Sequence, residues 1–355
     1  MPENPVISKT SIISDETFFK TSVLAGTGLM GSRLSFGNTA QPPVQVGKRI
    51  GIIGLDTSHS TEFTKIFNAV DASPDFGGYK VVAAYPYGSR DIESSASRIP
   101  AYIEAVRQMG VEIVDSIADL LKKVDVVLLE TNDGRLHLEQ AIPVFKAGKT
   151  MFIDKPIAGS LTDAFAIVQA AKDLKQPVFS TSSLRYMTNM DDIVKNQSLG
   201  RILGADTFGP SPLEVTHPDF FWYGIHGIEA LFTLMGVGCK TVSRVHTPDT
   251  DVVVGVWNDN RIGVFRGLRA GRTDYGGHAF GEKGIKTIGA NDGYEPLLKD
   301  VVKYFQTGIA PVTPDETLEI FIFMEAADES KRRGGASVSM GETAQKALAQ
   351  LTRSW

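Results

Sequence analysis

The chain has 355 residues, of which 42% are hydrophobic and 22% are charged, so it is long enough for two globular domains of ordinary composition. Its 36 basic and 41 acidic residues give a net charge of −5 without a basic block, which excludes nucleic acid as an expected partner. Cys239 is the only cysteine, which excludes an internal disulfide framework and a cysteine-based zinc site. No apolar run reaches the roughly 18 residues of a membrane-spanning helix, so no membrane span is expected.

Residues 1–46 are predicted to be a leader or arm outside the folded domains. Residues 14–20, followed by the weakly apolar residues 23–31, resemble a twin-arginine export signal in which Asp15-Glu16 replaces the arginine pair. Such a signal is read through its positive charge, whereas this segment carries Glu3, Asp15 and Glu16 against Lys9 and Lys20. The protein is therefore expected in the periplasm if the leader works and in the cytoplasm if it does not. The alternative is a disordered or loosely docked arm, with Pro42-Pro43 as a linker.

A strand over residues 49–53 runs into residues 54–59, Gly-Leu-Asp-Thr-Ser-His, which is half of a dinucleotide-binding fingerprint. The pattern Gly-x-Gly-x-x-Gly uses its first glycine for a tight turn, its second for the approach of the pyrophosphate and its third for helix packing. Gly54 is present, whereas Asp56 and His59 replace the other two. Three interpretations of Asp56 stay open: a capping or turn residue, a tolerated variant of a dinucleotide site, and a site with other chemistry.

A helix is expected directly after this turn, capped by Thr57 or Ser58. Its apolar residues recur at the spacing of one helical face, at Phe63, Ile66, Phe67 and Val70. The amides at the start of such a helix favour an anion. An ionised Asp56 would repel that anion, and its carboxylate is also placed to occupy the amides itself.

Further strands, separated by helical stretches, are predicted at residues 80–85, 111–114, 124–129, 150–153 and 178–181. This alternation predicts an α/β fold in which residues 47–185 form a doubly wound parallel sheet of the Rossmann type. Ligands of such sheets bind at the carboxyl ends of the strands. Those ends carry Gly54-Leu55-Asp56, Tyr85-Pro86-Tyr87, Glu130-Thr131-Asn132 and Asp154-Lys155-Pro156.

Residues 186–355 are predicted to form an α+β domain with a large, mainly antiparallel sheet. Strands at residues 240–246, 251–257 and 261–268 read as a meander, with residues 258–260 as a hairpin turn and residues 281–284 as another turn. A helix begins after Thr313, which is followed by proline at the first helical position and by Glu316 three residues on. It is expected to end at Gly334-Gly335.

Several motifs resemble the Gfo/Idh/MocA family of glucose-fructose oxidoreductases and inositol dehydrogenases. Asp154-Lys155-Pro156 resembles the Glu-Lys-Pro motif of that family, and Thr131-Asn132 with His137 resembles its Pro-Asn-x-x-His segment. Further matches in the same order along the chain are residues 199–202, 224–229, 281–284 and 314–330. The resemblance covers the chain from Lys48 to about Met340.

This resemblance implies an NAD(P)-dependent dehydrogenase that transfers hydride between nicotinamide and a carbinol carbon of a sugar, polyol or derivative. It implies that Lys155 lies between nicotinamide and substrate, where an ammonium stabilises alkoxide charge. It implies that His226 is the acid/base, since imidazole titrates near neutral pH. The alternatives are a surface lysine after a strand and a hydrogen-bonded core histidine. A homo-oligomer, dimer or tetramer, built through the open sheet is also implied.

The residues expected to face the cofactor are Gly54, Asp56, Thr57, Ser58, His59, Ser89, Arg90, Thr131, Asn132, His137, Asp154 and Lys155. The cofactor is expected to be NAD or NADP. No acidic residue ends the second strand to accept from the ribose hydroxyls, and Asp91 comes late. Ser89 and Arg90 are placed to hold a 2′-phosphate, which favours NADP, although a solvated turn explains them as well.

The residues expected near the substrate are Arg185, Tyr186, His217, Trp222 and Tyr223. Trp222 stands where the family has an aspartate, four residues before the histidine, which weakens the catalytic prediction. His217 is either a replacement polar group or a loop histidine near solvent. No metal is predicted, because only His226 and Glu229 share a tight ligand spacing.

Three functions are therefore weighed. The first is an NAD(P)-dependent oxidoreductase acting on a carbohydrate. The second is a family member with non-redox chemistry such as hydrolysis or elimination, and the third is a cofactor-free carbohydrate-binding protein. The departures at Asp56 and Trp222 support the last two.

Overall fold

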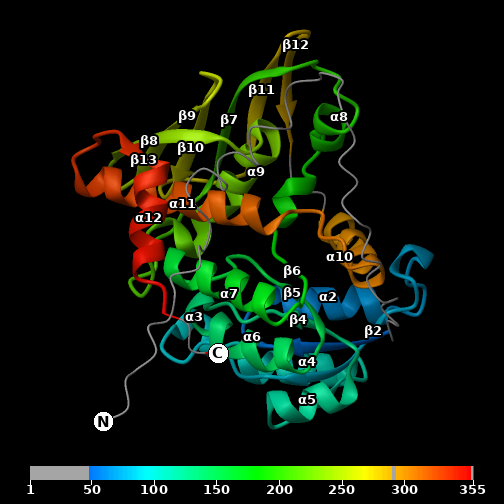
Figure 1. The fold of residues 1–355 in the computed structure, drawn as a ribbon. Coiled ribbons are helices and arrows are strands. Elements are labelled where there is room, and N and C mark those ends of the chain that lie inside the picture. The colour runs from blue at the N-terminus through cyan, green and yellow to red at the C-terminus, as the bar shows by residue number, and fades with distance from the viewer. Residues whose placement is uncertain (1–47, 290–292, 353–354) are drawn as a thin grey trace, which may run out of the picture. The chain divides into compact units, whose positions relative to one another are not determined.

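Two β-sheets organise the described part of the chain, which comprises residues 48–289, 293–352 and 355 of a computed structural model (Figure 1). The predicted leader, residues 1–46, lies outside the described residues. In the lower part of Figure 1, the parallel sheet carries the earlier half of the chain, and the second sheet lies above it.

The first sheet confirms the predicted Rossmann fold. Within the described residues it has six strands in the order β3-β2-β1-β4-β5-β6, and every neighbouring pair is parallel. The strands are β1 (Arg49–Ile53), β2 (Lys80–Tyr85), β3 (Glu112–Ile113), β4 (Val126–Leu129), β5 (Thr150–Ile153) and β6 (Val178–Phe179). The two outermost strands are shorter than predicted. The central strands β4 and β5 are fully buried, as their apolar runs indicate.

Helices connect these strands, and three of them, α2, α5 and α7, begin at side-chain caps. Thr57 accepts from the amide of His59 at the start of α2 (Ser58–Asn68), which confirms the expected cap. Ser116 and Ser160 cap the later helices in the same way. Val70 lies beyond the end of α2 and is exposed, so its predicted place on the apolar face is wrong. The other helices here are α3 (Glu93–Ala96), α4 (Ile99–Gln108), α5 (Ile117–Lys123), α6 (His137–Lys146) and α7 (Leu161–Asp173), with the short turns η1 (Pro74–Phe76), η2 (Gly134–Leu136) and η3 (Ser183–Tyr186).

The second sheet confirms the predicted mainly antiparallel domain. Its described strands have the order β12-β11-β7-β10-β9-β8-β13. They are β7 (Ile202–Pro210), β8 (Cys239–His246), β9 (Thr250–Trp257), β10 (Ile262–Leu268), β11 (Gly276–Gly281), β12 (Gly284–Ile288) and β13 (Val338–Ser339). The meander β8-β9-β10 lies where the sequence predicts it, and Asn260 turns the hairpin with a φ of 66°. The exception to the antiparallel pattern is β7, which runs parallel to β10.

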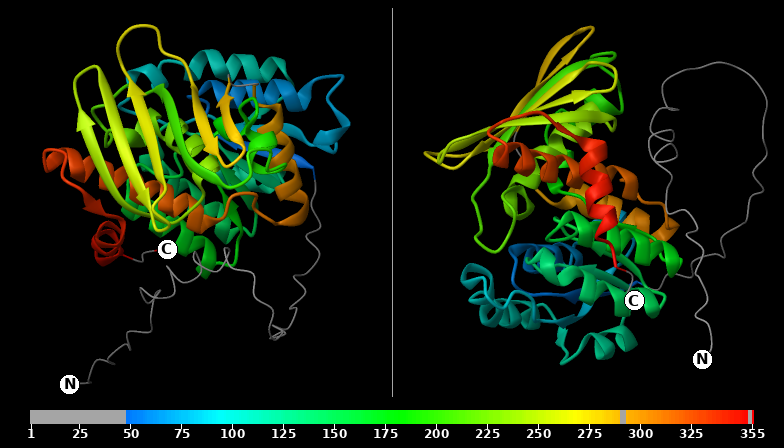
Figure 2. Two further views of the ribbon diagram at one scale, coloured as in Figure 1. Left: turned by 90° about the horizontal axis from the view of Figure 1, so that it is seen from above. Right: turned by 60° about the vertical axis from the view of Figure 1, so that its left-hand side comes forward.

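Helices cover one face of this second sheet. They include α9 (Ile225–Met235), which directly follows the π-helix η4 (Phe220–Gly224), and α11 (Pro314–Arg332). The hydroxyl of Thr313 accepts from the amide of Glu316, which confirms the predicted start of α11. Figure 2 shows the strands from above, with no described helix on the outer face. The remaining helices are α8 (Met190–Val194) and α12 (Met340–Ala349).

Helix α10 (Glu295–Thr307) returns to the first sheet, although it lies late in the chain. Leu298, Val301 and Phe305 are buried in the same core cluster as Ile52 of β1. The hydroxyl of Tyr304 donates to the carbonyl of Met151 over 3.2 Å. The predicted division into residues 47–185 and 186–355 stays a prediction. Helix α10 belongs to the later range in sequence but packs in the core of the first sheet. None of the described helices is both long and apolar enough to cross a membrane.

Candidate functional site

The carboxyl ends of β1, β4 and β5 bring polar side chains together at one edge of the parallel sheet. Ile53 pairs with Leu129, and Leu129 pairs with Ile153, so the residues that follow these strands are neighbours in space. Asp56, Glu130 and Asp154 all lie at this edge and are buried. Such an edge is where doubly wound sheets bind their ligands.

Gly54 makes the tight turn of the fingerprint. Its φ is +91°, and a Cβ built at this position would lie 2.5 Å from the backbone nitrogen of Thr131. Its amide donates to the carbonyl of Tyr85 over 2.9 Å. The first glycine of the pattern is therefore required by this fold.

Asp56 joins two loops and does not occupy the amides of α2. Its Oδ2 accepts from the amide of Ser89 at 2.7 Å and from the hydroxyl of Ser89 at 2.6 Å, and its Oδ1 accepts from the amide of Asn132 at 3.0 Å. The hydroxyl of Thr57 takes the cap position instead. The expectation that Asp56 fills the anion site at the helix start is therefore wrong. Asp56 is fully buried and joins the loops after β2 and β4, and its predicted contact with a cofactor stays a prediction.

His137 has a similar supporting position. Its Nε2 lies 2.7 Å from the carbonyl oxygen of Thr131, and its Nδ1 lies 3.1 Å from that of Ile157. The imidazole thus joins the loop after β4 to the loop after β5. It is fully buried, and its predicted contact with a cofactor stays a prediction.

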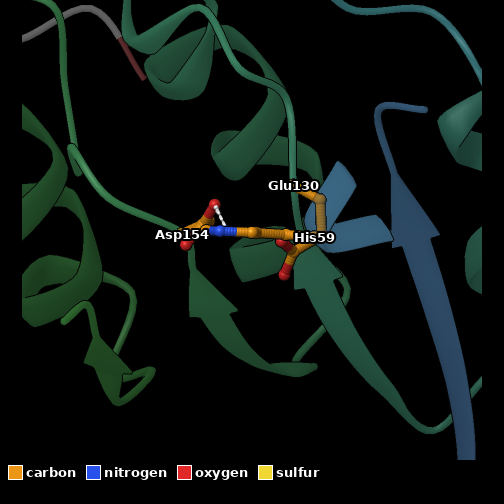
Figure 3. A group of neighbouring side chains, drawn as sticks. All are labelled: His59, Glu130 and Asp154. Carbon is orange, nitrogen blue, oxygen red and sulfur yellow. Dashed lines mark hydrogen bonds and ion pairs between the residues drawn. The ribbon is translucent and has the colours of Figure 1, made fainter. Parts of the chain in front are cut away.

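His59, Glu130 and Asp154 converge on one point, as Figure 3 shows. His59 Nδ1 lies 2.6 Å from Asp154 Oδ2. Both carboxylate oxygens of Glu130, and Oδ1 of Asp154, are buried without a hydrogen-bond partner among the described residues. Burial, and then the charge of Asp154, raise the pKa of Glu130 well above its ordinary value.

Lys155 and His226 meet across the ring of Tyr223. The Nζ atom of Lys155 lies 5.7 Å from the centroid of that ring, and the imidazole of His226 lies 5.0 Å from it, centroid to centroid. Lys155 is 6% exposed, so the alternative of an ordinary surface lysine is wrong. His226, in the first turn of α9, has its Nδ1 2.6 Å from the hydroxyl oxygen of Ser182. Burial, and then the charge of Lys155, lower the pKa of His226 well below its ordinary value, so the ring is neutral at pH 7.

Arg185 and Tyr186 bind internal acids at the junction of the two sheets. The guanidinium of Arg185 lies 2.6 Å from Glu316 Oε1 and 3.3 Å from Glu229 Oε1. The hydroxyl of Tyr186 donates to Asp300 Oδ2 over 2.8 Å. These contacts tie α9, α10 and α11 together, and the predicted role of both residues in substrate binding stays a prediction.

His217 is buried next to Trp222. Its Nε2 lies 3.2 Å from Asp133 Oδ1, and its ring lies 5.2 Å from that of Trp222. The expectation of a loop histidine near solvent is therefore wrong. Burial alone would raise the pKa of Asp133. The contacts with His217 and Arg135 outweigh this effect and lower the pKa, so the carboxyl stays ionised.

A cavity of about 110 Å³ lies at the end of β2, between this strand and α6. Its lining includes Tyr85, Tyr87, Arg90, Leu136 and Gln140. Arg90 is exposed, whereas the hydroxyl hydrogen of Ser89 is already donated to Asp56. Of the two residues predicted to hold a 2′-phosphate, Arg90 is the one that keeps free donors beside the cavity.

Sequence reasoning did not assign roles to Glu130, Asp133 and Ser182. Glu130 carries a signal, because a carboxylate directly follows the apolar run of residues 124–129. Ser182 and Asp133 carry none, since a serine or an aspartate in a loop is ordinary. Their partners, His226 and His217, lie far away in the sequence.

The comparisons with known proteins agree with this architecture. The pattern of the oxidoreductase family with an NAD-binding Rossmann fold matches residues 48–182. The dehydrogenase aclE of Aspergillus oryzae is 28% identical over 165 residues, which are 44% of this chain and 43% of that protein. The match thus spans less than half the length of this relative.

Two solved structures share the fold. The scyllo-inositol dehydrogenase of Lactobacillus casei, with bound NAD(H) and scyllo-inositol, aligns with a TM-score of 0.64 and 16% identity over 82% of this chain and 98% of its own. The myo-inositol 2-dehydrogenase of Lactobacillus plantarum aligns with a TM-score of 0.65 and 18% identity over 82% and 98%. At these identities the similarity shows the fold alone.

Proposed function

We propose that the protein is an NAD(P)-dependent dehydrogenase, because residues 48–182 match the oxidoreductase family with an NAD-binding Rossmann fold. Its substrate would be a sugar, a polyol or a derivative, oxidised or reduced at a carbinol carbon. The observation that carries this proposal is the approach of Lys155 and His226 to the same ring, that of Tyr223, beside the carboxyl edge of the parallel sheet. The inositol dehydrogenases with this fold support a polyol.

The residues at this edge fit a dinucleotide. Gly54 keeps the tight turn, and Asp56 is turned away from the start of α2, where Ser58 is exposed. The amides there favour a pyrophosphate. The cavity lined by Tyr85 and Arg90 lies at the end of β2, where this fold holds the adenosine. When bound, the cofactor supplies or accepts the hydride at nicotinamide C4.

The side chains of the protein would then move the proton and hold the charge. The ammonium of Lys155 stabilises negative charge that develops on the substrate oxygen. His226 is neutral, and in the tautomer in which Nδ1–H donates to the hydroxyl oxygen of Ser182, Nε2 is unprotonated and accepts the hydroxyl proton during oxidation. Ser182 therefore positions the ring, and His226 performs the proton transfer.

For the choice of cofactor, we propose NADP over NAD on the strength of Arg90. Its guanidinium borders the cavity at the end of β2, and no acidic residue directly follows that strand, although Glu139 of α6 also lines the cavity. Replacing Arg90 by Ala is expected to weaken NADPH more than NADH, because only NADPH carries the 2′-phosphate.

A titration of intrinsic fluorescence with each reduced and oxidised cofactor tests the proposal. Trp222 lies beside the site and is expected to report binding. Saturable binding of NADP(H) or NAD(H) is expected, followed by turnover of an inositol measured through cofactor absorbance. The absence of binding at millimolar cofactor would contradict the proposal.

Lys155→Met is expected to lower kcat by at least about 100-fold, because it removes the charge that faces the developing alkoxide. The melting temperature and the affinity for cofactor serve as checks that the fold survives. Lys240→Met, at an exposed lysine on β8, is the matched control and is expected to leave kcat unchanged. Retained turnover in Lys155→Met would refute the role of Lys155.

The non-redox alternative depends on Trp222. This residue stands where the related motif carries an aspartate, and its ring packs on His217. Two results together would favour that alternative. The first is a cofactor that binds tightly without net oxidation or reduction, and the second is hydrolysis or elimination of a glycoside.

A further inference from the structure

Three side chains form a compact group at the carboxyl ends of β1, β4 and β5. His59 comes from the first turn of α2, Glu130 directly follows β4, and Asp154 directly follows β5 (Figure 3). One ligand atom from each lies within 4.8 Å of the other two. Ligands of a metal ion with bonds of about 2.1 Å lie roughly 3 to 4 Å apart, so small side-chain movements would close the group around an ion.

The carboxylate oxygens of this group lack partners. Glu130 is 0% exposed, and both of its oxygens are buried without a hydrogen bond among the described residues, as is Oδ1 of Asp154. An unpaired buried polar atom costs about 1 to 3 kcal/mol, and more when it is charged. By contrast, the buried carboxylate of Glu319 accepts from the amides of Gly238 and Cys239. The orphaned oxygens of Glu130 and Asp154 therefore point to a ligand.

The local charge calls for a cation. The charges that act on Glu130 are the carboxylates of Asp154 and Asp56 and the ammonium of Lys155. The carboxylates of Glu130 and Asp154 lie close together with unpartnered oxygens, and a buried charge without a counter-ion is costly. A divalent cation between them would act as that counter-ion.

We propose that His59, Glu130 and Asp154 bind one divalent transition-metal ion, such as Mn²⁺ or Zn²⁺. An imidazole nitrogen with two carboxylates suits such ions, whereas Ca²⁺ requires six to eight oxygen ligands. The side chains of His59 and Asp154 keep 10% and 4% of their surface exposed, so the ion enters from their side and Glu130 closes the site behind it. His59 and Asp154 are also among the residues expected to face the cofactor, so the metal proposal is tested on the protein and the ion alone.

The full chain, treated with EDTA and then dialysed, is titrated with MnCl2 alone. Free and bound Mn²⁺ are measured by electron paramagnetic resonance, and the titration is repeated with ZnCl2 by isothermal calorimetry. One ion per chain is expected. His59→Ala and Glu130→Gln are each expected to weaken binding by at least about tenfold.

Glu319→Gln is the matched control, since it makes the same substitution at a buried glutamate whose oxygen is already hydrogen-bonded. It is expected to leave the affinity for Mn²⁺ unchanged. Circular dichroism checks the fold of each variant, and His59→Ala serves if Glu130→Gln fails to fold. The proposal is overturned if neither ion binds the wild-type chain at millimolar concentration, or if both site variants bind as tightly as the wild type.

A rise in thermal stability of Glu130→Gln, without any metal binding by the wild-type chain, would also overturn the proposal. It would mean that a proton on Glu130 satisfies the site. All these measurements are made without nicotinamide cofactor, so a failure to bind metal is distinguishable from a failure to bind NAD(P).

Discussion

Gly54 shows at the scale of one residue how the tight turn is maintained. We predict that Gly54→Ala lowers the free energy of unfolding by on the order of 3 kcal/mol, because it combines an unfavourable positive φ with a clash against the backbone of Thr131. Gly110→Ala is the control, since Gly110 also has a positive φ of 83° but has no atom within 4 Å of the added Cβ. This control is expected to cost about 1 kcal/mol.

The difference between these two variants isolates the clash at the turn. Urea denaturation of both variants and of the wild type measures it, provided that the slope against denaturant stays constant. Equal losses of stability would mean that the loop after β4 moves to accept a methyl group at position 54. The turn would then not require glycine for packing.

At the same scale, the sequence identifies residues better than it identifies their partners. Lys155 and His226 are both predicted from motifs, and they do contact the same ring. Asp56 is predicted as an anomaly of the fingerprint, yet the amides that its carboxylate binds lie 33 and 76 residues away in the chain. No local pattern encodes such contacts, because the sheet topology brings them together.

At the scale of elements, Glu319 links α11 to the start of β8. Its Oε1 accepts from the amides of Gly238 and Cys239, at 2.6 and 2.8 Å. Burial raises the pKa of Glu319 to about 7, although these amide bonds oppose the rise. In the unfolded chain the same carboxyl titrates near its ordinary value of 4.5.

The sign of the pH dependence follows from this difference. Between about pH 4.5 and pH 7 the folded carboxyl holds a proton that the unfolded chain has lost, so the free energy of unfolding falls as the pH rises. The stabilisation is complete below the unfolded pKa and is lost through the folded one. We predict that Glu319→Gln removes a fall on the order of 3 kcal/mol across this window.

Denaturant titrations at about pH 5 and about pH 8 measure this effect. Glu329→Gln, on the same helix, is a control of opposite sign, because bonds from Arg332 and Arg333 lower the pKa of Glu329. Its contribution is present above the unfolded pKa and is lost as the pH falls. A wild-type chain with the same pH slope as Glu319→Gln would show that Glu319 is ionised throughout.

Some helices and strands can be predicted from their own residues, whereas others depend on contacts that are distant in the sequence. The strands β4 and β9 follow directly from an apolar run and an alternating run, and the start of α11 follows from its cap. The return of α10 to the first core does not follow, because its amphipathic pattern fits any apolar surface. The parallel pairing of β7 with β10 likewise depends on the arrangement of the whole sheet.

At the scale of the whole molecule, the outer face of the second sheet lacks a cover among the described helices (Figure 2). Arg244 and Phe265 point to the helices, where they contact Asp328 and Gly227. Because side chains alternate along a strand, Val245 and the even-numbered residues of β10 point outward. Val245 is 68% exposed and Ile262 is 52% exposed. Exposed apolar faces of this kind are typical of protein interfaces.

We therefore propose that two copies of the chain associate through this face, as the implied homo-oligomer requires. The double variant Val245→Lys with Ile262→Lys is expected to reduce the mass measured by light scattering to that of one chain, because it places buried charges in the contact. Ile309→Lys is the control, since Ile309 is 73% exposed but lies in the connection after α10, away from the sheet. If the wild type already has the mass of one chain, or if both variants dissociate equally, this face is not the interface. The melting temperature of the double variant is compared with that of the wild type at high dilution, where both are single chains. The two temperatures are expected to be equal, because the substituted side chains face outward in a single chain. Equal melting temperatures show that the variant has lost association and not folding.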